Sequence, residues 1–98
     1  MENRFELIRE WAETRGLIHT GDPKTQVVKL MEEAGELAKA TLKGDEHEMV
    51  DAIGDIVVVL TNLAAMKGWK IEDCIDTAYD EIKNRKGKMS NGTFVKEQ

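Results

Sequence analysis

The sequence contains little cysteine and proline and no excess of positive charge. Cys74 is the single cysteine, so no disulfide bond can form within the chain, which is typical of a reducing compartment. The 14 lysine and arginine residues are outnumbered by 19 aspartate and glutamate residues, which gives a formal net charge of -5. Because duplex nucleic acid is bound through basic surfaces that neutralise phosphates, this balance disfavours a duplex-binding protein.

Long hydrophobic runs are missing as well. The longest strictly apolar run is Ile56–Leu60, far short of the roughly 20 residues that a membrane-spanning helix needs. The N-terminal residues are charged and lack the apolar core of a secretion signal. We therefore expect a cytoplasmic protein with no membrane partner.

The sequence predicts one all-α domain over residues 1–98. Hydrophobic residues make up 41% of the chain, which is enough for a core and argues against disorder. Apolar residues at helical spacing, bounded by start and stop signals, predict four main helices over residues 3–15, 23–43, 45–67 and 71–86. Residues 16–21 are expected to form a loop. Residues 88–98, which include the turn signal Asn91-Gly92, are expected to form an extended or mobile tail.

The helix over residues 45–67 is predicted to be the centre of an antiparallel four-helix bundle. Its run Ile56–Leu60 also has the composition of a buried strand, but the apolar segment continues to Met66 and has no strand partner in the sequence. A helix that is apolar on nearly every side must be covered on nearly every side. Because three other short helices do not suffice for this, we expect a homodimer or homotetramer.

Acidic residues interrupt the apolar pattern on the helix over residues 23–43. Glu32, Glu33 and Glu36 share one side of this helix within little more than one turn. This group alone is equally consistent with a solvated acidic face. Gln26 and Lys29 precede Glu33 by one to two turns, and we expect them to face any ligand that the carboxylates bind.

A second acidic group lies in the most apolar helix. Glu48, Asp51 and Asp55 follow one face at spacings of three and four residues, and Asn62 falls on nearly the same face. Like charges at this spacing repel, and an unpaired buried carboxylate is costly, so the two aspartates need a common counter-charge. Basic side chains are few nearby, which favours a divalent cation. Mg²⁺ prefers such carboxylate oxygens, whereas zinc is disfavoured because no cysteine or histidine accompanies the group.

The residues of both acidic segments resemble a known family. Residues 29–37 (KLMEEAGEL), followed by residues 51–60 (DAIGDIVVVL), are similar to the MazG-like branch of the all-α nucleoside triphosphate pyrophosphohydrolases. The family pattern is Glu-x-x-Glu, a spacer, and then Glu-x-x-Asp. Glu33 and Glu36 match the first half, and Asp55 matches the last position.

The chain departs from the family pattern at one position. Ala52 stands three residues before Asp55, where the family has glutamate. Asp51 lies one residue earlier on the same face, so the resemblance favours Asp51 with Asp55 as metal ligands, and Glu48 remains the alternative to Asp51. The departure puts the ligand set in doubt rather than the family.

The resemblance implies an Mg²⁺-dependent hydrolase, with Mn²⁺ as a substitute, that converts a nucleoside or deoxynucleoside triphosphate into the monophosphate and pyrophosphate. It implies metal ligation by four carboxylates, Glu33, Glu36, Asp51 and Asp55. Glu32 is then an extra ligand or a general base for water, and its plain alternative is a surface residue.

The resemblance also indicates that at least one of Lys83, Asn84 and Arg85 contacts phosphates. Their alternative role is to provide cations at a helix C-terminus, where the helix dipole favours them. Trp11 is either a core residue, which its spacing favours, or a stacking surface for a base. Three alternatives to the enzyme remain open: a non-catalytic oligomer that binds Mg²⁺-nucleotide, a structural interaction protein, and a phosphoribosyl-ATP pyrophosphohydrolase.

Overall fold

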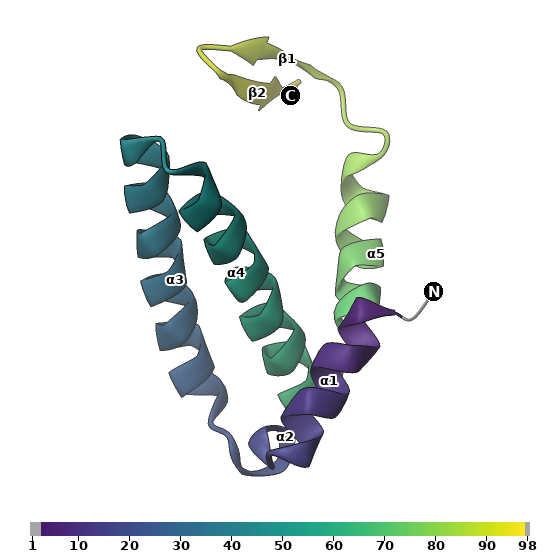
Figure 1. The fold of residues 1–98 in the computed structure, drawn as a ribbon. Helices are drawn as coiled ribbons and strands as arrows, with labels where there is room; N and C mark the ends of the chain where they lie inside the picture. Colours follow the sequence, from purple (N-terminus) through teal and green to yellow (C-terminus); the bar gives the residue numbers. More distant parts are fainter. Residues whose placement is uncertain (1–2, 98) are drawn as a thin grey trace.

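The computed structural model describes residues 3–97 and is mostly helical (Figure 1). In chain order, the elements are α1 (Arg4–Thr14), α2 (Leu17–Thr20), α3 (Pro23–Lys43), α4 (Glu46–Met66), α5 (Ile71–Ile82), β1 (Gly87–Ser90) and β2 (Thr93–Lys96). The predicted all-α class is confirmed for the body of the chain. A small antiparallel hairpin, which was not predicted, follows the helices.

Side chains at the starts of three helices cap them. The carboxylate or amide oxygens of Asn3, Asp22 and Asp45 accept hydrogen bonds from backbone N–H groups in the first turns of α1, α3 and α4. Pro23 occupies the first turn of α3, where its missing N–H is not needed. The starts of these helices are therefore fixed by hydrogen bonds between residues that are close in the sequence.

Three segments differ from the sequence-based expectation. The loop predicted for residues 16–21 is wrong for its central part, because Leu17–Thr20 form the short helix α2. Gly16 adopts a left-handed conformation and ends α1, and the chain resumes helical geometry directly after it. The helix α5 ends at Ile82 rather than near Lys86.

The predicted tail contains a β-hairpin. Its strands pair in register from Gly87 with Lys96 to Ser90 with Thr93. Asn91 and Gly92 form the two-residue connection, both with positive φ values of 50° and 80°. Asparagine followed by glycine tolerates this backbone geometry, which matches the twist of the two strands.

The helices α3 and α4 form an antiparallel pair, and α4 also contacts α1, α2 and α5 (Figure 1). In Figure 1, α5 diverges from α4 toward the hairpin, and α3 lies on the other side of α4. The radius of gyration is 16.0 Å, whereas a compact domain of this length has about 13 Å. The single chain is therefore open rather than closely packed.

The core of the single chain is correspondingly small. Its buried apolar side chains are Ala12, Ala40, Ala52, Val59 and Ala64. Large apolar side chains on α3, α4 and α5 remain substantially exposed, among them Val28, Met31, Leu42, Val50, Ile53, Ile75, Tyr79 and Ile82. Burial of such surface is the main stabilising contribution in folding and association, so much of this contribution is not realised within one copy.

Within residues 3–97, α4 is the one helix whose length and hydropathy would allow it to cross a membrane. This is weak evidence for a membrane span, because the central helix of a water-soluble helical protein passes the same test. Only 28% of its most apolar stretch is buried. The expectation of no membrane partner stays a prediction.

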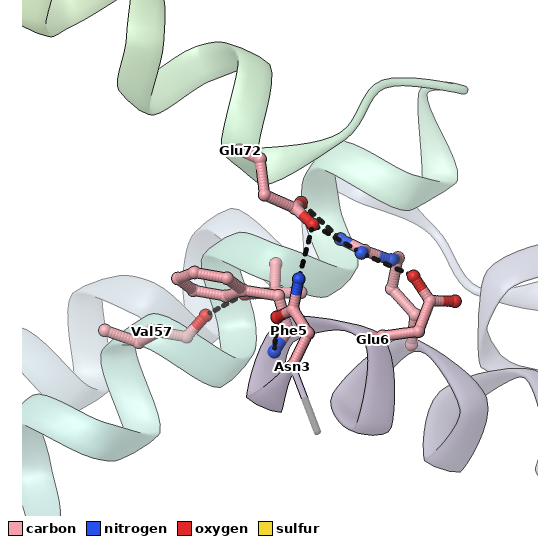
Figure 2. A network of polar contacts seen from close by, with 7 residues as sticks. Asn3, Phe5, Glu6, Val57 and Glu72 are labelled. Atoms are coloured by element: carbon pink, nitrogen blue, oxygen red, sulfur yellow. Dashed lines mark hydrogen bonds and ion pairs between the residues drawn. The ribbon is translucent and has the colours of Figure 1, made fainter. Parts of the chain in front are cut away.

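An ion-pair network joins α1 to the start of α5 (Figure 2). Arg9 donates to both carboxylate oxygens of Glu72 at 2.6 and 2.7 Å, and Asn3 donates to the same carboxylate at 3.4 Å. Arg9 also pairs with Glu6 at 2.8 Å. The hydrogen bonds from Arg9 lower the pKa of Glu72 to about 2.

We predict that this network contributes to stability near neutral pH and loses its contribution in acid. Because the folded-state pKa of Glu72 lies below the ordinary glutamate value of 4.5, its contribution is present above pH 4.5 and disappears as the pH falls toward 2. Glu72→Gln is expected to lower the Tm at pH 7 and to lower it less at pH 3. Thermal unfolding followed by circular dichroism at both pH values measures this. Glu81→Gln, an exposed substitution on the same helix, is the control, and an equal effect of both variants would contradict the prediction.

Candidate functional site

Two clefts lie along the interface between α3 and α4, and each is lined by two of the four predicted metal-binding carboxylates. The first, which we call the Glu33 cleft, has a volume of about 510 Å³ and is lined by Trp11, Leu17, Gln26, Lys29, Glu33, Asp55, Val58, Val59 and Asn62. The second, the Asp51 cleft, has about 350 Å³ and is lined by Glu36, Lys39, Lys43, Glu48, Asp51 and Ala52. Glu33 and Glu36 are three residues apart on α3, so the two clefts are neighbours.

The carboxyl group of Glu33 has the most perturbed environment in the site. Glu33 is half-buried, and its Oε2 atom is buried without a hydrogen-bond partner. Burial raises the pKa of this carboxyl above its ordinary value, and the like charges of Glu36 and Asp55 raise it further, while Lys29 opposes the shift. The structure therefore brings together at least three of the four predicted metal-binding carboxylates closely enough to interact.

These carboxylates are not neutralised by direct ion pairs. The ion pairs found among residues 3–97 join Arg9 to Glu6 and Glu72, His19 to Glu13, and Lys83 to Asp80. None of them involves the acidic residues of α3 or α4. Lysines are nevertheless present, because Lys29 lines the Glu33 cleft, and Lys39 and Lys43 line the Asp51 cleft without forming an ion pair there.

The predicted site residues separate into those that share a cleft and those that do not. Gln26 and Lys29 line the Glu33 cleft together with Glu33 and Asp55, as the helical spacing predicted. Asp51 is exposed rather than buried, and it lines the Asp51 cleft with Glu36 and the alternative ligand Glu48. Ala52, which replaces the family's glutamate, is buried between the helices.

The remaining predicted residues lie outside both clefts. Glu32 is exposed on α3 and lines neither cleft. Lys83, Asn84 and Arg85 are exposed beyond the end of α5, where Lys83 pairs with Asp80 at 3.1 Å. Within one copy, these three residues are not part of the walls around Glu33 and Asp55.

The donor set fits a hard divalent cation, although no three ligands converge in a single chain. Among residues 3–97, no group of three or more His, Cys, Asp or Glu side chains is arranged to hold a metal ion. The available donors are carboxylate oxygens, and one of them, Glu33 Oε2, is buried with no partner. Mg²⁺ is commonly held by one or two carboxylates together with waters and substrate phosphates, so this arrangement is compatible with it.

Four residues of the Glu33 cleft have no role assigned from the sequence: Leu17, Val58, Val59 and Asn62. Leu17 reaches the cleft from α2, which lies in a segment predicted to be a loop. Asn62 shares the face of Asp55, and this spacing was the available signal. Trp11, expected in the core, is 49% exposed and lines the cleft.

The fold and the clefts define a helical domain with carboxylates that line two neighbouring clefts and form no ion pairs. The chain belongs to the family of the MazG nucleotide pyrophosphohydrolase domain, whose model matches residues 21–90. The match includes α3, α4 and α5, and thus both acidic segments. Membership supports a nucleotide pyrophosphohydrolase activity in general, and members of the family generally depend on a divalent metal ion.

A curated relative supports the sequence similarity but adds no function. The chain is 39% identical over 64 residues to an uncharacterised 18.2 kDa protein from the rep-hol intergenic region of Haemophilus phage HP1 (strain HP1c1). The aligned part covers 65% of this chain and 39% of the relative, so the chain spans well under half of the relative's length. No solved structure matches.

We predict that Glu33 destabilises the metal-free protein at neutral pH. A folded-state pKa above the ordinary glutamate value of 4.5 means that the folded protein binds this proton more tightly than the unfolded chain does. The contribution of Glu33 to the free energy of unfolding is therefore fully present below pH 4.5, and it is lost as the pH rises through the folded-state pKa. Glu33→Gln is expected to raise the Tm at pH 7 in EDTA and to reduce the stabilisation that added Mg²⁺ gives.

Thermal unfolding in EDTA and in Mg²⁺ measures both effects. Glu10→Gln, an exposed change on α1, is the matched control, because it removes one negative charge away from the clefts. A Glu33→Gln protein that is less stable than wild type in EDTA at pH 7 would contradict the prediction.

Proposed function

We propose that the protein is an Mg²⁺-dependent pyrophosphohydrolase that converts nucleoside or deoxynucleoside triphosphates into monophosphates and pyrophosphate, in a housekeeping role for the nucleotide pool. The observation that carries this proposal is the pair Glu33 and Asp55, which line one cleft without forming an ion pair. An uncompensated acidic cleft does not attract a triphosphate by itself, because both are negatively charged. It accommodates one when divalent cations lie between them.

Four carboxylates, Glu33, Glu36, Asp51 and Asp55, would hold the metal in this proposal, and Glu48 is the alternative to Asp51 because both line the same cleft. Bound Mg²⁺ neutralises phosphate charge and lowers the pKa of a coordinated water. Mn²⁺ has similar ligand preferences and is a plausible substitute.

The chain's own residues would then bind and orient the substrate. Lys29 lines the Glu33 cleft and presents a cation to the phosphates, and Gln26 presents an amide to the same space. Glu32, which is exposed beside the cleft, is the proposed extra ligand or general base for the attacking water. We also propose that phosphates are contacted by Lys83, Asn84 and Arg85. These residues line neither cleft within one copy, so they would have to approach a cleft of another copy.

We also propose that the active form is a homodimer or homotetramer. The radius of gyration of 16.0 Å and the exposed apolar faces of α3, α4 and α5 support association of copies. Association would cover α4 and offers a route by which Lys83 and Arg85 of one copy approach a cleft of another.

One observation favours a second candidate function, a non-catalytic oligomer that binds Mg²⁺-nucleotide. Ala52 is buried at the position where the family pattern has a metal-binding glutamate, and Asp51 faces the second cleft instead. A reduced ligand set can retain metal-nucleotide binding and lose turnover. Phosphoribosyl-ATP is kept as an alternative substrate, because it also presents a triphosphate.

A panel of canonical and modified nucleoside and deoxynucleoside triphosphates with Mg²⁺ tests the proposal. We expect pyrophosphate rather than orthophosphate as the product, loss of turnover in EDTA, and a decrease of at least about 100-fold in kcat/KM for Glu36→Gln. Ion-exchange chromatography of the products and a pyrophosphate assay measure this. Phosphoribosyl-ATP is included in the panel.

The outcomes separate the candidates. Mg²⁺-dependent nucleotide binding without turnover would favour the non-catalytic oligomer. Orthophosphate release, or turnover that persists in EDTA and in Glu36→Gln, would contradict the proposed reaction.

The oligomeric state has its own expected outcome. Light scattering coupled to size-exclusion chromatography should give at least twice the chain mass of 11.1 kDa. Val50→Glu places a charge on a 71% exposed apolar position of α4 and is expected to shift the mass toward the monomer. Glu81→Gln is the control, and a monomeric wild type at micromolar concentration would contradict the prediction.

A further inference from the structure

A buried amide in the Glu33 cleft has an unused hydrogen-bonding atom. Asn62 is 2% exposed, and its Oδ1 atom is buried with no hydrogen-bond partner. A buried polar atom of this kind is uncommon, because it loses its bonds to water and gains none in return. Asn62 nevertheless lines the cleft, so its amide group is placed beside a space that a ligand can enter.

A second amide, that of Gln26, lies at the same level of the helix pair. Gln26 precedes Glu33 by seven residues on α3, and Asn62 follows Asp55 by seven residues on the antiparallel helix α4. Each amide is therefore about two turns away from the carboxylate on its own helix. Because the helices are antiparallel, both amides lie on the same side of the two carboxylates along the helix axes. All four side chains line one cleft, which thus has a carboxylate end and an amide end.

The amide end is too far from the carboxylate end to share a metal ion. Seven residues correspond to about 10 Å along a helix, whereas oxygen ligands lie roughly 2.0–2.6 Å from Mg²⁺ or Ca²⁺. The side chains around the amides are also unlike a metal site. Trp11, Leu17 and Val59 provide apolar walls to the same cleft.

Trp11 offers an aromatic surface in this cleft. It is 49% exposed, and the guanidinium of Arg15 lies 4.3 Å from the centre of its ring. This cation–π contact with Arg15 restrains the orientation of the Trp11 ring. Trp11 still lines the cleft. An aromatic ring, aliphatic walls and two buried amides form a suitable environment for a flat heterocycle with donors and acceptors on its edge.

We propose that the amide end of the Glu33 cleft binds the nucleobase of the substrate, with Asn62 hydrogen-bonded to the base edge, Gln26 beside it and Trp11 against the ring. The proposal rests on the proposed function, since a triphosphate at the carboxylate end directs the rest of a nucleotide along the cleft. Because a side-chain amide offers one acceptor and donors on adjacent atoms, it pairs with a base edge that offers the complementary pair. Asn62 is thus a specificity-determining residue.

Binding of two probes to the full chain tests the proposal without relying on turnover. The first set comprises α,β-methylene analogues of the deoxynucleoside triphosphates, and the second probe is inorganic tripolyphosphate, each with Mg²⁺ in titration calorimetry. Asn62→Leu is expected to weaken binding of the preferred nucleotide analogue about tenfold or more and to leave tripolyphosphate binding within about twofold. Asn62→Asp, which keeps the volume and loses the donor, is expected to change the ranking of the bases.

Thr61→Val is the matched control. Thr61 is 0% exposed, lies next to Asn62 on α4 and donates to the backbone oxygen of Val57, and it does not line the cleft. It is expected to bind both probes as the wild type does. Circular dichroism and thermal unfolding establish whether each variant is folded. If Asn62→Leu does not fold, the comparison of the two probes is made with Asn62→Asp.

A fluorescence measurement gives a second readout. In a Trp69→Phe background, Trp11 is the single tryptophan, and we expect its emission to be quenched by the nucleotide analogue and not by tripolyphosphate. Equal effects of Asn62 substitutions on both probes, or no effect on either, would overturn the base site and leave the proposed function standing. Absence of binding of either probe to the wild type would overturn both.

Discussion

The turn between α3 and α4 is the constraint on which the rest of the structure depends. Gly44 adopts a left-handed conformation with a φ of 71°, and the N–H groups of Gly44 and Asp45 donate to the carbonyl oxygens of Thr41 and Ala40 at 3.2 and 3.0 Å. This is a Schellman motif, and the side chain of Asp45 immediately caps the next helix. A turn this short fixes the register of the two helices, so Glu33 meets Asp55 rather than an apolar neighbour.

The same register explains why α4 has two different requirements. Its residues Ala52 and Val59 pack against neighbouring helices, and small side chains allow close approach, while Asp55 between them faces a cleft. The helix α4 is apolar on several sides. A 98-residue chain whose helices are arranged openly does not bury all of these sides. The unburied apolar surface and the carboxylates without ion pairs therefore both support the oligomer and the metal-nucleotide ligand that we propose, since either would add stability to the folded chain.

Local signals made most of the helices and the polar residues of the Glu33 cleft predictable, whereas the contributions of Trp11 and Leu17 to its walls were not predictable. Asn3, Asp22 and Asp45 mark helix starts through hydrogen bonds within a few residues, and the Asn91-Gly92 turn signal marks the turn of the hairpin. The exposure of Trp11 depends on how α1 meets α4, which no local pattern specifies. Asn62 was found at the right spacing, but only the packing of α3 on α4 shows that its oxygen is buried without a partner.

The polar groups of the cleft show how stability and function oppose each other in this chain. Glu33 is held where burial and two like charges raise its pKa, and the oxygen of Asn62 is held where it has no partner. Apolar residues of similar size at both positions would remove these unfavourable terms and leave the helix pair intact. Glu33 lies at the carboxylate end of the cleft, seven residues from Gln26. Asn62 lies at the amide end, seven residues from Asp55. Our proposal accounts for unfavourable groups at both ends of one cleft together, because a nucleotide has a charged end and a hydrogen-bonding end.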